Sequence, residues 1–226
     1  MGISFKTKKY QIIKKAITQD LASFISGYFM MKRRVTKKFL DDRYISPFEE
    51  GWGTWKDEQI PNTYSHYADL VMEALLEKVR PRMEKETKLK LIPTYSYARI
   101  YKKGDVLHRH KDRFSCEIST TMFLGGDPWN IYLEPNKNVG KAPEGPYVPT
   151  TNKGIKISLK PGDMLMYSGC ELEHWREAFQ GNNCVQVFLH YNQITSPGAI
   201  ENRFDSRPFL GLPSWFKNFK LPLPKK

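Results

Sequence analysis

The chain has 226 residues and a formal net charge of +12, and 40% of its residues are apolar and 13% aromatic. That composition excludes a disordered polar chain and is typical of an ordered globular protein that can bury a core. No apolar run approaches the roughly 20 residues of a membrane span, and the first six residues lack the apolar core of a secretory signal, so we expect neither membrane insertion nor secretion.

The positive charge is concentrated near the chain ends. The first 38 residues hold ten lysines and arginines against one acidic residue, Asp20. Such a bias can attract nucleic acid or an acidic substrate. We favour a solvated face, because these lysines lack the aromatic interleaving of a single-strand binding surface. The three cysteines lack Cys-x-x-Cys spacing, which predicts a reducing, cytoplasmic compartment and neither disulfides nor structural zinc.

Helices are predicted mainly in the first 88 residues. A short strand over residues 10–17 is followed by Thr18, a suitable N-cap for a helix over 19–32. Residues 39–61 carry the prolines and glycines typical of a long loop. A second helix is expected to begin near residues 62–63 and to run to about 87.

From residue 89 onward the apolar positions alternate with a period of two, which predicts strands. Helices first and strands afterwards indicate a mainly β, α+β protein in which helices back one sheet of an antiparallel double-stranded β-helix, a jelly-roll core. We therefore expect one domain over 1–226, with a helical part at 1–88, a jelly-roll core at about 89–195 and a C-terminal extension at 196–226.

A His-x-Asp pair follows the glycine turn at Gly104. On a strand, residues two apart share a face, so His110 and Asp112 can reach one metal ion together. His174 is the candidate for a second histidine, because it follows a Pro-Gly-Asp turn at 161–163 and an apolar strand. Two histidines and one carboxylate leave coordination positions open, which suits iron(II) and oxygen chemistry. A His-x-Asp tripeptide by itself is also common on protein surfaces.

The flanking residues extend this pattern. Gly-Asp-Val-Leu-x-x-His-x-Asp at 104–112, an apolar strand at 118–124, and then Pro-Gly-Asp, an apolar strand and a histidine resemble the 2-oxoglutarate/iron(II) dioxygenases, specifically the prolyl 4-hydroxylase-like group. The resemblance covers about residues 95–191. It implies Fe(II) held by His110, Asp112 and His174, with 2-oxoglutarate decarboxylated to succinate while an unactivated C–H bond is oxidised by O2. The substrate would be a protein, peptide or small molecule, with a prolyl residue as one option.

Three residues are expected to bind the cosubstrate. Tyr101 matches a tyrosine that faces the cosubstrate in that group, and strand parity places Arg99 on the same face. A buried arginine needs an anionic partner, supplied either by the distal carboxylate of 2-oxoglutarate or by an acidic side chain elsewhere. Most members of the group carry a basic residue nine to eleven positions after the distal histidine, where this chain has Asn-Cys-Val at 183–185. We therefore predict Arg99 as the anchor, with Arg176 as the alternative.

Two other function classes fit parts of the pattern. A cupin-like metalloprotein without 2-oxoglutarate would use His108, His110 and Glu117, although its spacings differ in two places. A non-enzymatic basic binding module would leave the triad residues incidental. Two further expectations concern this region: Arg113 and Glu117, four residues apart, form a structural pair, and His190 is a core histidine on an apolar strand.

Overall fold

The computed structural model describes residues 5–140 and 147–218. Its helices are α1 (Phe5–Lys8), α2 (Gln19–Asp41) and α3 (Leu70–Thr87), with the 3-10 turns η1 (Phe114–Cys116), η2 (Arg203–Ser206) and η3 (Ser214–Phe216). Its strands are β1 (Tyr10–Ile13), β2 (Tyr64–Tyr67), β3 (Leu91–Tyr101), β4 (Leu107–His110), β5 (Ile118–Gly126), β6 (Ile131–Leu133), β7 (Ile155–Ile157), β8 (Met164–Ser168), β9 (His174–Arg176) and β10 (Cys184–Gln193).

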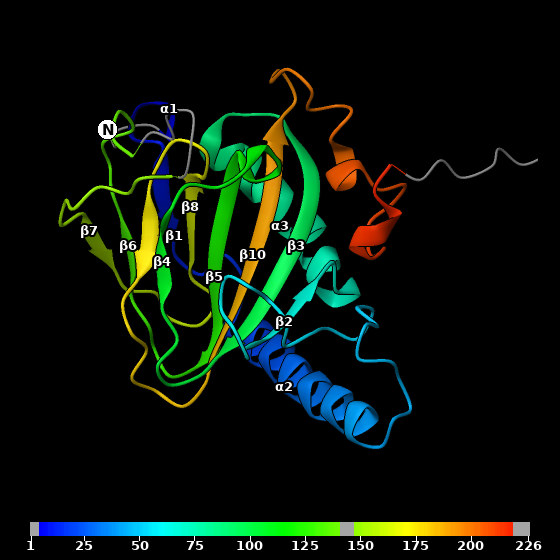
Figure 1. Ribbon diagram of the computed structural model, residues 1–226. Helices are drawn as coiled ribbons and strands as arrows, with labels where there is room; N and C mark the ends of the chain where they lie inside the picture. Colours follow the sequence, from blue (N-terminus) through cyan, green and yellow to red (C-terminus); the bar gives the residue numbers. More distant parts are fainter. Residues whose placement is uncertain (1–4, 141–146, 219–226) are drawn as a thin grey trace, which may run out of the picture.

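The strands form two antiparallel sheets that face each other. The larger sheet has the order β1-β8-β5-β10-β3-β2, and the smaller has the order β4-β9-β6-β7. Helices α2 and α3 lie against the larger sheet, on the side away from the smaller one (Figure 1). The predicted fold class, an antiparallel β core backed by N-terminal helices, is therefore confirmed. No helix among the described residues is long and apolar enough to cross a membrane.

Strand parity separates two hydrophobic cores. Along β3, Ala98 and Ile100 pack with α2 and α3 on the outer side of the larger sheet, whereas Tyr97 and Tyr101 contact the core between the two sheets. The alternation follows from the period-two geometry of a strand. Side chains on the same parity as Tyr97, including Arg99, therefore face the interior of the barrel.

The first long helix begins where the sequence predicts. The hydroxyl of Thr18 accepts a hydrogen bond from the backbone N–H of Leu21 at 3.3 Å, which satisfies one of the free donors at the helix start. Helix α2 continues past the predicted end at residue 32 to Asp41. Ion pairs from Lys37 to Asp41 and from Lys38 to Asp42, each four residues apart, support this last part.

The predicted start of the second helix is wrong. Residues Tyr64–Tyr67 form the edge strand β2, paired antiparallel with β3, instead of the first turn of a helix. Ala68 then adopts a left-handed conformation with φ of 59°, and the carboxylate of Asp69 accepts from the backbone N–H groups of Val71 and Met72 to begin α3. The free edge of β3 thus determines the conformation of a segment whose apolar spacing also fits a helix.

The described part of the C-terminal extension packs beside β2 and β3. Arg207 donates to the buried carboxylate of Glu73 and to the carbonyl oxygen of Thr94, both at 3.0 Å. Asp205 accepts from Arg113 and from the hydroxyl of Tyr67. The extension is therefore joined to the sheet through buried charges. The predicted helical part includes residues 1–4 and the predicted C-terminal extension includes residues 219–226, and both segments lie outside the described residues.

Candidate metal centre

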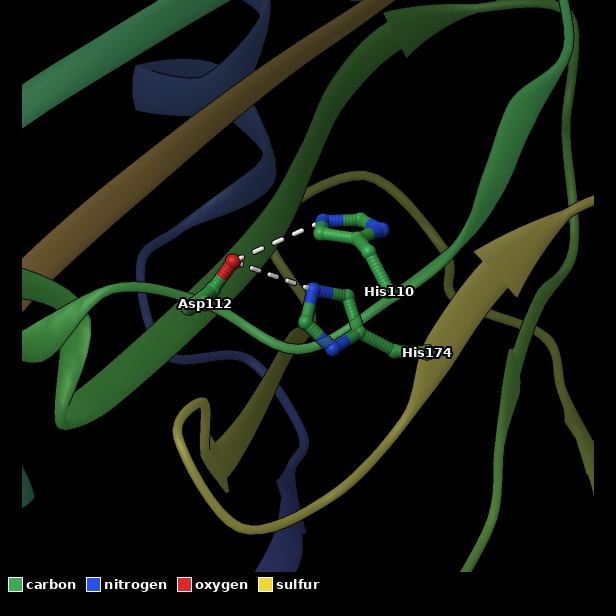
Figure 2. Close-up of side chains that lie close together, drawn as sticks. All are labelled: His110, Asp112 and His174. Atoms are coloured by element: carbon green, nitrogen blue, oxygen red, sulfur yellow. Dashed lines mark ion pairs between the residues drawn. The ribbon is translucent and has the colours of Figure 1, made fainter. Parts of the chain in front are cut away.

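Three metal-ligating side chains meet between the two sheets. Nε2 of His110 lies 3.5 Å from Oδ1 of Asp112, and Nε2 of His174 lies 3.4 Å from the same oxygen. The two imidazole ring centres are 4.2 Å apart. Figure 2 shows both rings turned toward the carboxylate. One ligand atom from each residue lies within 4.8 Å of the others, close enough for a single metal ion.

Backbone pairing brings the triad together. His110, the last residue of β4, is directly opposite His174, the first residue of β9. Asp112 lies beyond the end of β4, so strand parity is not what places it beside His110. Its backbone N–H instead donates to the carbonyl oxygen of Gly169 at 2.9 Å, which fixes its position at the turn before β9.

Both histidines are held in the form that a metal requires. Nδ1 of His110 donates to the carbonyl oxygen of His108 at 2.7 Å, and Nδ1 of His174 donates to that of Leu172 at 3.1 Å. Each Nε2 therefore keeps its lone pair for a ligand. Burial alone would raise the pKa of Asp112, but His174 and His110 hold it well below the usual range. The donor set is one carboxylate and two imidazoles, which fits a divalent transition metal.

The triad borders a cavity of about 220 Å³ between the sheets. Tyr95, Tyr97 and Tyr167 contribute phenol rings to its wall, and the loop before β2 contributes Asp57 and Gln59. The amide Nε2 of Gln59 lies 3.3 Å from the free nitrogen of His110. A segment that the sequence indicates only as a loop therefore covers the metal-binding atoms.

Arg99 faces this cavity, and its charge is already paired. Its Nε and Nη2 donate to Oδ2 of Asp57 at 2.8 and 2.5 Å, and Nη2 also donates to Gln59 at 2.7 Å. The Arg99 and Asp57 side chains are only 7% and 9% exposed. Burial opposes the charged form of Arg99, but Tyr101, Tyr97 and Asp57 raise its pKa overall. Of the two partners expected for Arg99, the structure contains the acidic side chain.

Arg176 is also buried, and it lacks an acidic partner among the described residues. Nη1 donates to the carbonyl oxygen of Trp129 at 2.5 Å and Nη2 to the hydroxyl of Thr121 at 3.0 Å, while Nε has no hydrogen-bond partner within residues 5–140 and 147–218. The guanidinium stacks over the Trp129 ring at 5.0 Å, and burial lowers its pKa. A buried cation with an unused donor has the capacity to bind an anion.

The comparisons with known proteins bear on the fold. No family model matches the sequence, and the curated proteins contain no match. Among solved structures, a prolyl-4-hydroxylase from Pseudomonas putida is similar, with a TM-score of 0.54 and 14% identity over 84% of this chain and 95% of that one. The α-ketoglutarate-dependent epimerase SnoN from nogalamycin biosynthesis has a TM-score of 0.60 and 12% identity over 84% of this chain and 80% of that one.

HygX from Streptomyces hygroscopicus, solved with nickel and 2-oxoglutarate bound, has a TM-score of 0.55 and 12% identity over 84% of this chain and 85% of that one. This chain has the double-stranded β-helix fold. The resemblance read from the sequence is thereby confirmed at the level of the fold.

Two further predictions, the cupin-like ligand set and the pair of Arg113 and Glu117, are contradicted by the structure. His108 is exposed and belongs to neither group of ligand atoms found among the described residues, so the cupin-like ligand set is not assembled. The predicted pair of Arg113 and Glu117 is also not formed. Arg113 binds Asp205 at 2.7 Å, and Glu117 accepts from the backbone N–H of Gln193 at 3.0 Å, because the two side chains leave η1 toward different neighbours.

Sequence reasoning missed several residues around the metal-binding atoms. Asp57 and Gln59 lie in a loop without periodicity, so no pattern could place them. His190, expected as a core histidine, is buried as predicted but lines the cavity beside Asp112. Burial lowers the pKa of its imidazole to about 4, so it is neutral at pH 7. His190 has the same strand parity as Phe188 on β10, whose side chain lies in the core between the sheets. This parity could have indicated that His190 faces the cavity.

Proposed function

We propose that the protein is an iron(II)- and 2-oxoglutarate-dependent oxygenase. The observation that carries this proposal is the convergence of two imidazole Nε2 atoms and one carboxylate oxygen on a cavity inside a double-stranded β-helix. When bound, iron(II) and 2-oxoglutarate supply the chemistry that oxidises an unactivated C–H bond with O2 and yields succinate. His110, Asp112 and His174 would hold the metal and leave coordination positions open.

The surrounding residues would orient the ligands and limit access of water. The backbone carbonyls that accept from the two Nδ1 atoms fix the direction of each imidazole. Tyr167 packs against His174 with ring centres 4.6 Å apart, which prevents that ring from turning. Gln59 and the aromatic wall restrict solvent at the same point, and a site that excludes water strengthens its own electrostatic interactions.

We place the distal carboxylate of 2-oxoglutarate at Arg176 in preference to Arg99. Arg99 already forms a buried ion pair with Asp57. Arg176, in contrast, has an unpartnered Nε and no carboxylate as an ion-pair partner among the described residues. Arg176 follows His174 by two residues on β9, so the two side chains leave the same face of the strand. Arg176 does not line the cavity itself, but Leu107, directly opposite it on β4, does.

We place the entrance for the organic substrate at a second cavity of about 390 Å³, which shares Asp57, Tyr95 and Tyr97 with the metal cavity. Lys56 lines it and forms no ion pair among the described residues, while Arg113 and Lys217 both bind Asp205. The cavity wall carries four cationic side chains, with Lys32 as the fourth, against the two carboxylates of Glu50 and Asp57, and this excess favours a substrate carrying a negative charge. A protein, a peptide or a small molecule fits this proposal, and a prolyl residue remains one candidate.

Anaerobic titration tests the proposal directly. Protein loaded with Fe(II) should develop a metal-to-ligand charge-transfer band in the visible when 2-oxoglutarate is added. The Asp112→Ala variant should show no band, and the matched variant His108→Ala, which alters an exposed histidine two residues before His110, should behave like the wild type. Iron binding without a band in the wild-type protein would refute 2-oxoglutarate as the cosubstrate, and absence of iron binding would refute the metal site as well.

A further inference from the structure

A second group of ligand atoms lies on the other side of Asp112. One atom each from Asp112, Cys116 and His190 lies within 4.8 Å of the others. Cys116 ends η1 and His190 is on β10, and both are buried, at 3% and 6% exposure. All three residues line the 220 Å³ cavity. The group is therefore accessible from the same space as the triad.

The two groups use different oxygens of the shared carboxylate. Oδ1 of Asp112 lies 3.5 and 3.4 Å from the triad histidines, whereas Oδ2 accepts from the hydroxyl of Ser119 at 3.0 Å. The second oxygen is therefore directed away from the triad and toward His190, whose Nδ1 is 2.9 Å from the same hydroxyl. A carboxylate in this position can bridge two ions, one on each oxygen.

Ser119 sets the tautomer of His190. A hydroxyl donates only one proton, and Ser119 is within reach of two acceptors, Oδ2 of Asp112 and the carbonyl oxygen of Cys116 at 2.8 Å. Because the ionised carboxylate is the stronger acceptor, the contact with His190 is a hydrogen bond from Nδ1–H to the hydroxyl oxygen. The other ring nitrogen, Nε2, is then unprotonated and has a lone pair for a ligand. If a metal binds Oδ2, the hydroxyl of Ser119 can still donate a hydrogen bond to the carbonyl oxygen of Cys116.

The sulfur of Cys116 completes a nitrogen, sulfur and oxygen set. Its only hydrogen-bond partner among the described residues is the hydroxyl of Tyr95 at 3.1 Å, and all three cysteines are free of disulfides. A thiolate and an imidazole favour Zn²⁺ and Co²⁺ over Mg²⁺ or Ca²⁺, which prefer oxygen ligands alone. The thiol must lose its proton to the solvent when it binds, and the negative thiolate offsets the charge of a second ion beside the triad.

We infer that Asp112, Cys116 and His190 form a second divalent-metal site, selective for thiophilic ions, which shares Asp112 with the triad. This inference goes beyond the proposed oxygenase, because that function requires one ion only. The second site also has a consequence for the oxygenase: an ion bound there occupies the cavity through which a substrate must approach the triad. Zn²⁺ in excess of one equivalent should therefore inhibit turnover.

Cobalt titration of the metal-free, full-length protein tests the inference. With a non-thiol reductant present, the wild type should bind two equivalents of Co²⁺, and a near-ultraviolet thiolate-to-cobalt charge-transfer band should grow with the second. The Cys116→Ser variant should bind one equivalent and show no band. The Cys170→Ser variant, which removes a thiol outside the site, should match the wild type. His190→Gln, a second and independent variant, should also lose the second equivalent.

A single equivalent of Co²⁺ in the wild type, or a band that survives Cys116→Ser, would overturn the second site. These results are separate from the fate of the oxygenase proposal. If that proposal fails, the Fe(II) protein gives no band with 2-oxoglutarate although the cobalt–thiolate band is present. If only the second site fails, the 2-oxoglutarate band forms and the cobalt–thiolate band does not.

Discussion

Replacement of Arg176 with methionine should weaken 2-oxoglutarate binding without unfolding the protein. Arg176 is 1% exposed, and its guanidinium has no carboxylate partner among the described residues. A desolvated contact between a guanidinium and a carboxylate is worth about 2–5 kcal/mol when one side is truncated, which corresponds to an increase in Kd of about 30-fold to about 4,000-fold. The charge-transfer band of the anaerobic Fe(II) protein measures that Kd, and iron stoichiometry should stay unchanged.

The same substitution should cost less stability than a replacement of Arg99. Arg176→Met removes an unpaired buried charge, so the melting temperature without 2-oxoglutarate should be unchanged or higher. Arg99→Met leaves Asp57 buried without its cation, which should lower the free energy of unfolding by about 3–5 kcal/mol and change the affinity for 2-oxoglutarate less. If Arg99→Met weakened 2-oxoglutarate binding more than Arg176→Met, the assignment of the anchor from unpaired donors would be wrong.

Three further predictions address the metal-binding atoms and the C-terminal segment. Asp112→Ala should lower iron affinity by more than the roughly 10- to 100-fold typical of losing an outer-shell partner, with an unchanged circular dichroism spectrum; iron stoichiometry equal to the wild type would contradict it. Gly169→Ala adds a methyl group that meets Oδ2 of Asp112 and the carbonyl oxygen of Cys116. It should reduce metal affinity, whereas Gly27→Ala, where the methyl group meets open space in α2, should raise stability by about 0.5–1 kcal/mol; equal effects of the two changes on metal affinity would show that Gly169 does not position the carboxylate. Burial alone would raise the pKa of Asp205, but Arg113 and Lys217 hold it well below the usual range, so the unfolded chain takes up this proton first as pH falls through about 4. The stabilisation is therefore complete above that pH and lost below it, and urea unfolding of Asp205→Asn should depend less steeply on pH between about 5 and 3 than that of the wild type.

Local patterns in the sequence were enough to predict the fold class and to indicate that His110, Asp112 and His174 lie close together. Successive side chains of a strand point to opposite faces of the sheet, and this parity placed Tyr97, Arg99 and Tyr101 on the barrel side correctly. His110 and His174 could be paired from their spacing to turns and strands, because the antiparallel register that joins β4 to β9 follows from those turns. These features depend on residues close together in the chain, or on the strand order that the resemblance to the prolyl 4-hydroxylase-like group implies.

Tertiary structure alone decided which residues pair. The segment Tyr64–Tyr67 fits a helix by its spacing, and only the free edge of β3 made it a strand. The partner of Arg99 is Asp57, 42 residues away in a loop without periodicity, so no local pattern indicates it. The lack of an acidic partner for Arg176 among the described residues depends on every group that surrounds it in the folded protein, and the sequence alone does not indicate those groups. The direction of the His190 ring depends in the same way on Ser119, a hydroxyl whose partners are fixed only when β5 and β10 lie side by side.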